Sequence, residues 1–299
     1  MTAKTIILDT DIGGDIDDTW ALGMLLNSPE LDPKLILTCT ADTVYRARLS
    51  CKFLEKCGRS DVPVGVGLRF ASDGPRETQA DWVGEYQLRD YPGTVYENGI
   101  QRALEILETC DDVTIIEIGP MTNLAEICRR RPDLIRKCNL VAMAGSIEKG
   151  HMGKEGAIAE FNVEQDIEAA QSVWAAEWKN ITITPLDTCG EVRLKGEMFR
   201  RITLSDRPVP RFILENFRVW QDALKWGLKD QSSVLFDTVA VYLAFTRELL
   251  EVETMKLIVD DKGFLRRSGS GRDVDVAIRW KSLESYYDFL TKRLTVSSK

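Results

Sequence analysis

Histidine is almost absent from this chain, because His151 is the only one among 299 residues. A zinc site built from several histidines is therefore excluded, and a Ser-His-Asp or Cys-His nucleophile system would have to use this one residue. His151 lies in a stretch with two nearby glycines, Gly150 and Gly153, and we interpret it as a loop residue. Any acid–base chemistry would then rest on carboxylates.

Long apolar runs and basic clusters are also missing. No stretch reaches the roughly 20 apolar residues of a membrane-spanning helix, and residues 1–8 lack the features of a signal peptide. The net charge is −8 without a long run of Lys and Arg, so we expect no nucleic-acid binding, which needs clustered cations. The seven cysteines are scattered without a C-x-x-C pair and indicate reduced thiols in a cytoplasmic protein.

Strand-like and helix-like patterns alternate along the chain. Aliphatic and β-branched runs predict strands at 5–8, 35–39, 62–66, 113–118, 140–144 and 181–184. Helical apolar spacing predicts helices at 19–26, 44–56, 99–108, 121–130 and 166–174. Such alternation favours an α/β fold with a largely parallel sheet covered on both faces. No linker divides the chain, so we predict a single domain over residues 1–299, with a loop or hairpin at 263–273 and a frayed end at 297–299.

Five aspartates crowd into the segment 9–18, between the first predicted strand and the first predicted helix. Sites in open α/β sheets form beyond the carboxyl ends of the strands, and Gly13 and Gly14 let the chain turn so that several acids converge. Clustered carboxylates repel one another unless a cation neutralises them, and oxygen ligands favour Ca²⁺ or Mg²⁺. Helix capping would explain two such acids but not five.

An acidic metal site of this kind suits glycosidic hydrolysis. One carboxylate can take a proton from water, while the cation fixes sugar hydroxyls and the water. Surrounding negative charge also favours a transition state with oxocarbenium character.

Four ordered segments resemble motifs of the inosine/uridine-preferring nucleoside hydrolase family. The segment 6–22 is similar to the opening motif of the family, and 117–125, which reads EIGPMTNLA, to its central G-P-x-T-N-x-A motif. The segment 159–162, AEFN, looks like its sugar-binding motif, and 236–240, FDTVA, stands where the family usually has H-D-x-x-A. The resemblance extends over most of the chain.

The resemblance implies a role for individual residues. It implies Ca²⁺ ligands at Asp11, Asp18, Asp237 and the backbone carbonyl of Ile118. Asp17 would be the general base for the attacking water, and Glu160 and Asn162 would bind sugar hydroxyls. The implied fold is an open, mostly parallel Rossmann-like sheet, and the implied protein is a homo-oligomer that acts on a small sugar or nucleoside.

Three positions depart from the family pattern, and we assign them to substrate binding. Phe236 replaces the histidine that, in members that have it, helps to protonate the leaving base, and Phe236 cannot donate a proton. Lys154 stands where many members have an asparagine that binds the far end of the ribose, and Asp42 where an asparagine usually follows the second strand. These changes predict a substrate other than inosine or uridine. The one histidine is far from Phe236 in sequence and offers no evident replacement.

Several alternatives stay open. The protein could bind a sugar or nucleoside without turnover, which the missing donor at position 236 would explain, or it could hydrolyse another carbohydrate-derived substrate. A Mg²⁺ phosphohydrolase fits the acidic loop but leaves the other three motifs as coincidences. Asp15 is an alternative base, Asp187 could border the pocket, and Trp220 and Trp226 could line the pocket or belong to the core.

Overall fold

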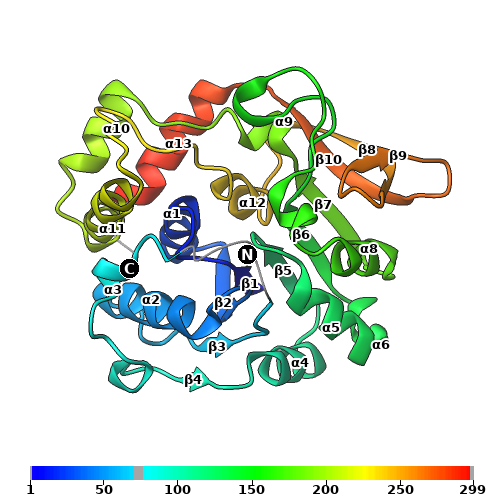
Figure 1. The fold of residues 1–299 in the computed structure, drawn as a ribbon, viewed down its shortest axis with the longest axis horizontal. Helices are drawn as coiled ribbons and strands as arrows, with labels where there is room; N and C mark the ends of the chain where they lie inside the picture. Colours follow the sequence, from blue (N-terminus) through cyan, green and yellow to red (C-terminus); the bar gives the residue numbers. More distant parts are fainter. Residues whose placement is uncertain (1, 71–76, 297–299) are drawn as a thin grey trace.

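The computed structural model describes residues 2–70 and 77–296, so the predicted frayed end at 297–299 lies outside the described residues. One mixed sheet runs through this part of the chain in the order β4-β3-β2-β1-β5-β6-β7-β10-β8-β9 (Figure 1). The strands are β1 (Lys4–Thr10), β2 (Leu31–Thr38), β3 (Val64–Val66), β4 (Val95–Tyr96), β5 (Thr114–Glu117), β6 (Asn139–Met143), β7 (Asn180–Thr184), β8 (Leu250–Val259), β9 (Leu265–Arg267) and β10 (Arg272–Trp280). Pairing is parallel from β4 through to β10, and only β8 pairs antiparallel, with β10 and β9.

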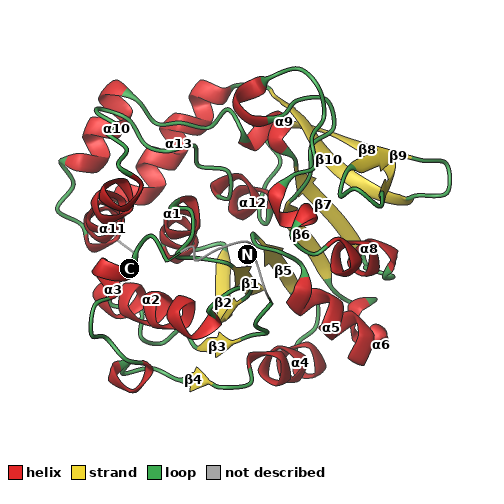
Figure 2. Cartoon of the chain, viewed as in Figure 1, coloured by secondary structure: helices red, strands yellow, loops and turns green. Residues whose placement is uncertain are grey.

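Helices lie on both sides of the strands (Figure 2). The α-helices are α1 (Asp17–Leu26), α2 (Thr43–Lys56), α3 (Ala80–Val83), α4 (Gly99–Thr109), α5 (Thr122–Arg130), α6 (Pro132–Ile135), α7 (Phe161–Glu164), α8 (Ile167–Ala175), α9 (Leu186–Cys189), α10 (Gly196–Thr203), α11 (Pro208–Leu224), α12 (Thr238–Leu243) and α13 (Leu283–Thr295), with short 3₁₀ turns η1 (Leu88–Asp90) and η2 (His151–Gly153). The predicted α/β fold with a mostly parallel sheet is confirmed. The eleven predicted elements are all present, with ends shifted by a few residues.

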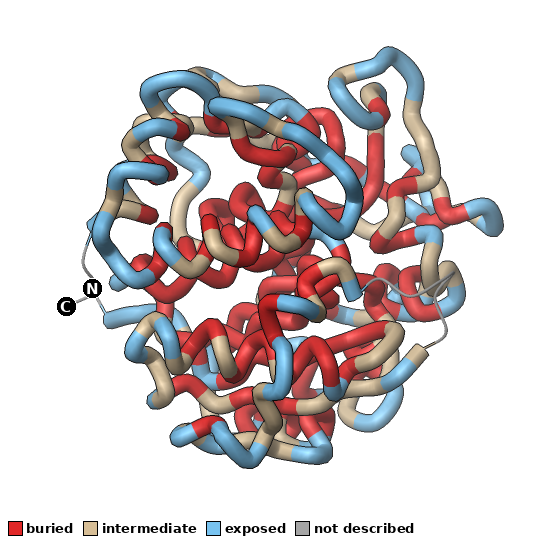
Figure 3. The backbone as a smooth tube through the Cα atoms, turned by 60° about the vertical axis from the view of Figure 1, so that its left-hand side comes forward, coloured by how far each residue is buried: buried red, intermediate tan, exposed pale blue. Residues whose placement is uncertain are grey.

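The core has two parts because successive strand residues point to opposite faces of a sheet. Ile6 and Leu8 of β1 join the apolar cluster that includes residues of α1, α2, α11 and α13, whereas Ile7 joins the cluster of α4, α5 and α8. The central chain segments are buried and the outer loops are exposed (Figure 3). A sheet covered on both faces can position loops only at its edges and strand ends, so the strand ends are where a site can form.

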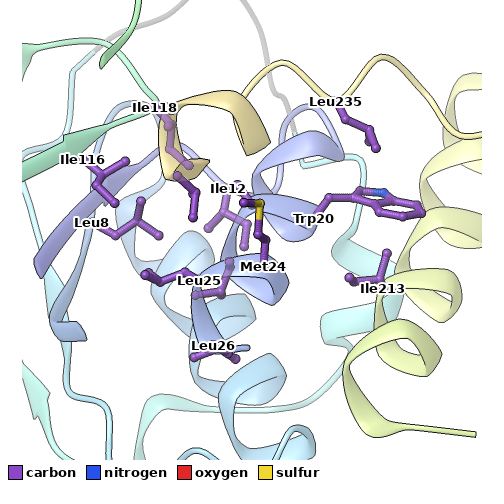
Figure 4. Close-up of a cluster of buried hydrophobic side chains, with 14 of the residues drawn as sticks. Leu8, Ile12, Trp20, Met24, Leu25, Leu26, Ile116, Ile118, Ile213 and Leu235 are labelled. Carbon is purple, nitrogen blue, oxygen red and sulfur yellow. The ribbon is translucent and has the colours of Figure 1, made fainter. Parts of the chain in front are cut away.

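Helix α1 is apolar on nearly every side, and all of its residues are buried. Trp20 and Met24 lie among side chains from the sheet and from α11 (Figure 4), and the Trp20 ring meets Phe217 edge to face at 6.3 Å between centroids. A helix that is hydrophobic all round is held by burial on every side rather than by one stripe. Its first turn, which carries Asp17 and Asp18, is therefore held in a fixed place.

The segment 263–273 contains β9 and the turn into β10. β8 pairs antiparallel with β9 on one side and with β10 on the other, so β9 pairs with a strand that lies before the predicted segment, and the rest of that segment forms the turn into β10. Among the described residues, no helix combines the length and apolar character that crossing a membrane requires.

Candidate active site

The acidic residues gather at the carboxyl ends of β1 and β5. β1 ends at Thr10, the chain turns through 11–16, and α1 then begins at Asp17. Ile118 directly follows β5, and its N–H donates to the Asp9 carbonyl at 2.9 Å, which extends the β1–β5 pairing by one residue. Asp237 stands at the N-terminus of α12, where its side chain makes no capping hydrogen bond. Its carboxylate is therefore available to the cavity.

These elements enclose a cavity of about 300 Å³. Its lining consists of Asp11, Asp15, Asp17, Asp18, Ile118, Met143, His151, Glu160, Phe161, Asn162, Leu186, Phe236 and Asp237. Ligand pockets for small molecules usually begin at about this volume. Every predicted site residue except Asp42 and Lys154 is in this lining.

Three of the carboxylates form a tight cluster. Asp17, Asp18 and Asp237 each offer one oxygen, and these atoms lie within 4.8 Å of one another. Burial, followed by the charges of neighbouring carboxylates, raises the pKa of all three well above the usual range. Like charges held this close without solvent are costly, so the arrangement favours either retained protons or a bound cation.

Arg46 is a buried positive charge close to the acidic residues. Its guanidinium lies 3.6 Å from Asp11, and it also donates to the carbonyls of Thr40 and Ile12 at 2.9 Å each. The charge of Arg46 offsets part of the negative charge of the cavity. An oxygen-rich, acidic and buried site of this kind fits a divalent cation such as Ca²⁺.

Short hydrogen bonds fix the acidic loop. The Thr10 hydroxyl donates to Asp18 at 2.5 Å and accepts the N–H of Ile12 at 3.1 Å. Asp15 is exposed, and its carboxylate accepts the N–H of Ile16 at 2.7 Å. Gly13 has a φ of +106° and would bring any β-carbon to 2.6 Å from the Tyr45 ring, so only glycine fits this turn.

Glu160 and Asn162 also line the cavity. The two carboxylate oxygens of Glu160 accept the N–H groups of Gly145 and Asn162, each at 2.9 Å. Burial raises the pKa of Glu160 to about 7. The Asn162 amide donates to the Met143 carbonyl at 3.1 Å, so both side chains are held rigidly. Their assignment to sugar hydroxyls remains a prediction.

The central motif has a structural role that sequence reasoning did not identify. The Asn123 side chain donates to Asp9 at 2.9 Å and to the Thr38 carbonyl at 3.1 Å, and it accepts the N–H of Leu68 at 2.8 Å. These bonds join the ends of β1 and β2 to the segment after β3. Asp9 and Glu117 are fully buried beside Asn123, and burial raises the pKa of Asp9 to about 7. Neither acid lines the cavity.

Two predicted substrate-binding residues lie apart from the cavity lining. Asp42 caps α2 by accepting the N–H groups of Val44 and Tyr45 at 3.0 Å, and it lies 3.4 Å from Arg69. Lys154 is exposed on the loop after β6. Their contact with substrate stays a prediction.

The two tryptophans considered for the pocket also lie elsewhere. Trp220 is 1% exposed and belongs to the core, whereas Trp226 is 53% exposed and contacts the Trp220 ring edge to face at 5.0 Å. The alternative that Trp220 is a core residue is therefore confirmed, and neither ring is in the cavity lining.

His151 lies in the cavity lining, although its distance from Phe236 along the sequence argued against a contact between them. It is a loop residue, as interpreted, but its ring meets Phe236 edge to face at 6.2 Å between centroids, and both residues line the cavity. The distance along the sequence concealed this contact, because it depends on the loop after β6 folding towards the start of α12.

Asp187 anchors the loop that carries His151. Its carboxylate accepts three backbone N–H groups, from Ile147 and Glu148 at 2.8 Å and from Lys149 at 3.1 Å. It lines a separate, neighbouring hollow and not the main cavity.

Replacement of Asp187 by alanine is expected to lower the free energy of unfolding by about 1–3 kcal/mol, since it leaves three N–H groups without their acceptor. Urea unfolding measures the change. Asp187→Asn keeps one oxygen and should lose less, so equal losses for both variants would contradict the anchoring role.

Comparison with known proteins agrees with the geometry. The pattern of the family described as inosine-uridine preferring nucleoside hydrolase matches residues 6–282. A pyrimidine-specific ribonucleoside hydrolase RihA from Photobacterium profundum is 29% identical over 240 residues, which are 76% of this chain and 76% of the relative. A probable uridine nucleosidase 2 from Arabidopsis thaliana is 25% identical and covers 82% of this chain and 79% of its own length.

Solved structures share the fold. A plant nucleoside hydrolase, the PpNRh1 enzyme, superposes with a TM-score of 0.81 at 22% identity and covers 98% of this chain and 99% of its own. A purine-preferring ribonucleoside hydrolase from Gardnerella vaginalis gives a TM-score of 0.79 at 20% identity, with 98% of each chain covered.

Proposed function

The chain belongs to the inosine-uridine preferring nucleoside hydrolase family, and from this membership we propose that it hydrolyses the N-glycosidic bond of a nucleoside with the help of a bound Ca²⁺. The observation that carries the proposal is the cavity in which Asp17, Asp18 and Asp237 converge and whose lining also contains Glu160 and Asn162. Carboxylates for a metal and a base meet polar side chains for a sugar in one enclosed space.

The ligands that we propose for Ca²⁺ are Asp11, Asp18, Asp237 and the backbone carbonyl of Ile118, all of which line the cavity. Ca²⁺ accepts six to eight oxygen ligands in flexible geometry, which suits an acidic site without imidazole or thiolate pairs. When bound, such a cation would offset the clustered negative charge and lower the pKa of a coordinated water.

Asp17 is the general base in this proposal. It lies at the buried start of α1, where its carboxylate can take the proton of the attacking water. Glu160 and Asn162 hold the sugar hydroxyls, and their own hydrogen bonds to backbone groups keep them in place. The apolar side chains of Phe161 and Phe236 border the space for the base.

The structure changes the reasoning about substrate. The expectation of a substrate other than inosine or uridine rested on Phe236, Lys154 and Asp42. His151 contacts Phe236, and the other two residues lie outside the cavity lining. The expectation of a substrate other than inosine or uridine stays a prediction, and we propose a nucleoside as the substrate, with both base classes to be tested. The same contact weakens the alternative of a binding protein without turnover.

A hydrolysis screen tests the proposal. Purified protein is stripped with a chelator and offered uridine, cytidine, inosine and adenosine, with Ca²⁺, with Mg²⁺ or without a divalent cation. We expect free base and reducing sugar from at least one nucleoside with Ca²⁺, and loss of this activity after chelation. Nucleoside binding without release of base would favour the binding protein, and release of phosphate from phosphoesters with Mg²⁺ would favour a phosphohydrolase.

A further inference from the structure

The cavity has one imidazole among many carboxylates. His151 stands in its lining beside Phe236, with an angle of 80° between the two ring planes. Among residues 2–70 and 77–296, no hydrogen bond engages the ring nitrogens of His151. The imidazole is exposed to solvent while it borders the cavity. It can therefore meet a bound molecule and still exchange protons with water.

Hydrogen bonds hold the loop that carries His151 in a defined conformation. Its base is fixed by Asp187, as described above. Across the loop the Gly150 N–H donates to the Lys154 carbonyl and the Gly156 N–H to the Glu148 carbonyl, each at 2.8 Å. Residues 149 and 155 also form a β-bridge. These bonds close a small hairpin with His151 near its tip.

The tip adopts a backbone conformation that most side chains avoid. Met152 has a φ of +62°, in the left-handed region, and Gly153 follows with +71°. A non-glycine residue pays for such a conformation, so the surrounding bonds must impose it. The result is that the residue just before Met152 is presented to the cavity beside Phe236.

Cleavage of a nucleoside leaves an electron pair on a ring nitrogen of the base, and a proton donor there lowers the barrier. The other titratable side chains of the cavity are carboxylates, and the proposed mechanism uses four of them for the metal and the water. The remaining acids are Asp15 on the acidic loop and Glu160, whose two oxygens already accept N–H groups. The imidazolium of His151 is the donor that stands at the apolar part of the cavity, next to Phe236.

We propose that His151 is the general acid that protonates the leaving base. The inference rests on the proposed nucleoside hydrolysis. The C1′–N bond breaks and its electron pair goes to the base nitrogen, which takes the proton of the His151 imidazolium. Water forms the new C1′–O bond and gives a proton to Asp17. Asp17 then loses this proton to solvent and His151 regains one, so nucleoside and water become free base and ribose.

The charged groups around the loop come from several segments. Arg267 of β9 lies 4.0 Å from Glu148, and Asp187 of α9 accepts the N–H groups at the base of the loop. On the loop itself are Glu148, Lys149, Lys154 and Glu155, and from the segment after α9 come Glu191, 3.0 Å from Lys149, and Arg193, which reaches the Met152 sulfur at 3.6 Å. The carboxylates of the cavity share its lining with His151.

The test compares leaving groups. His151→Ala and His151→Gln are measured in the holoenzyme with Ca²⁺ on the best nucleoside and on a riboside that carries a nitrophenolate leaving group, which departs without protonation. We expect kcat on the nucleoside to fall by about 10²–10⁴-fold, and kcat on the nitrophenyl riboside to stay within a few-fold. Glu155→Gln, a change in an exposed residue of the same loop, should alter neither rate.

A rescue variant separates chemistry from loop structure. Phe236→His in the His151→Ala background places an imidazole on the other partner of the ring contact. We expect the double variant to cleave the nucleoside at least ten-fold faster than His151→Ala does. Equal losses on both substrates, or wild-type rates in His151→Ala, would overturn the general-acid role while nucleoside hydrolysis still stands. A wild-type holoenzyme that cleaves neither riboside would overturn the proposed function and this inference together.

Discussion

Asp17→Asn is expected to lower kcat for nucleoside hydrolysis by about 10²–10⁴-fold, the usual contribution of a general base. Asparagine has nearly the shape of aspartate, but its amide cannot accept the proton of water. Asp17 is 4% exposed and begins a helix whose residues are all buried, so the substitution should leave the fold in place. The proposed Ca²⁺ ligands are unchanged, and we expect the variant to keep the metal.

Steady-state kinetics and calcium titration of the same preparation measure the two effects. Asp15→Asn is the matched control, because Asp15 lines the same cavity from the exposed part of the loop and is the alternative base. Full turnover in Asp17→Asn together with a loss in Asp15→Asn would transfer the base role to Asp15. Loss of calcium in Asp17→Asn would instead make Asp17 a ligand, which its place within 4.8 Å of the other two carboxylates would allow.

The first two thirds of the fold could be predicted because local pattern and tertiary structure agree there. The buried strands β1, β2 and β5 are short apolar runs, and the helices between them carry helical apolar spacing. Parallel strands need crossovers, so alternation of the two patterns already implies the sheet. The acids of segment 9–18 could be predicted for the same reason, since they are close in sequence and follow a strand.

Helix α12 in the C-terminal third was not predicted, because tertiary contacts override local preference there. Helix α12 is only six residues long, and four of them, Thr238, Val239, Val241 and Tyr242, favour strands. All six are buried between the sheet and its neighbours, so packing and not propensity makes this segment helical. Because this helix is short, buried and made of strand-favouring residues, its sequence does not indicate a helix.

Long-range contacts explain what was missed in the site. The approach of His151 to Phe236 depends on the Asp187 anchor and on the loop hairpin, neither of which leaves a periodic trace in the sequence. For Asp42 the difficulty is that its position in the sequence fits two roles. An aspartate before a helix can be a ligand or a helix cap, and in the structure its carboxylate caps α2.

Asp237→Asn is expected to be more stable than the wild type in the absence of metal and less stable than the wild type in the presence of Ca²⁺. Asp237 is 3% exposed, and its nearest charged neighbours are the carboxylates of Asp17 and Asp18. In the metal-free wild type this third carboxylate adds repulsion or has to keep a proton in a buried place. Asparagine removes that cost at nearly the same shape, so the metal-free variant should unfold at a higher urea concentration than the metal-free wild type.

With Ca²⁺ the wild type should be the more stable of the two proteins. A ligand that binds only the folded state stabilises it by RT ln(1 + [L]/Kd), which is about 4.1 kcal/mol at a thousand times Kd. The wild type should gain stability of this order, whereas the variant, which has lost a charged ligand, should gain little and should also lose turnover. Urea unfolding in Ca²⁺ and in chelator measures both effects. Asp206→Asn changes the net charge equally at a side chain that is 99% exposed, and it should behave as the wild type does. An equal gain from Ca²⁺ in wild type and Asp237→Asn would contradict Asp237 as a ligand, since a cation held elsewhere would not respond to the loss of this carboxylate.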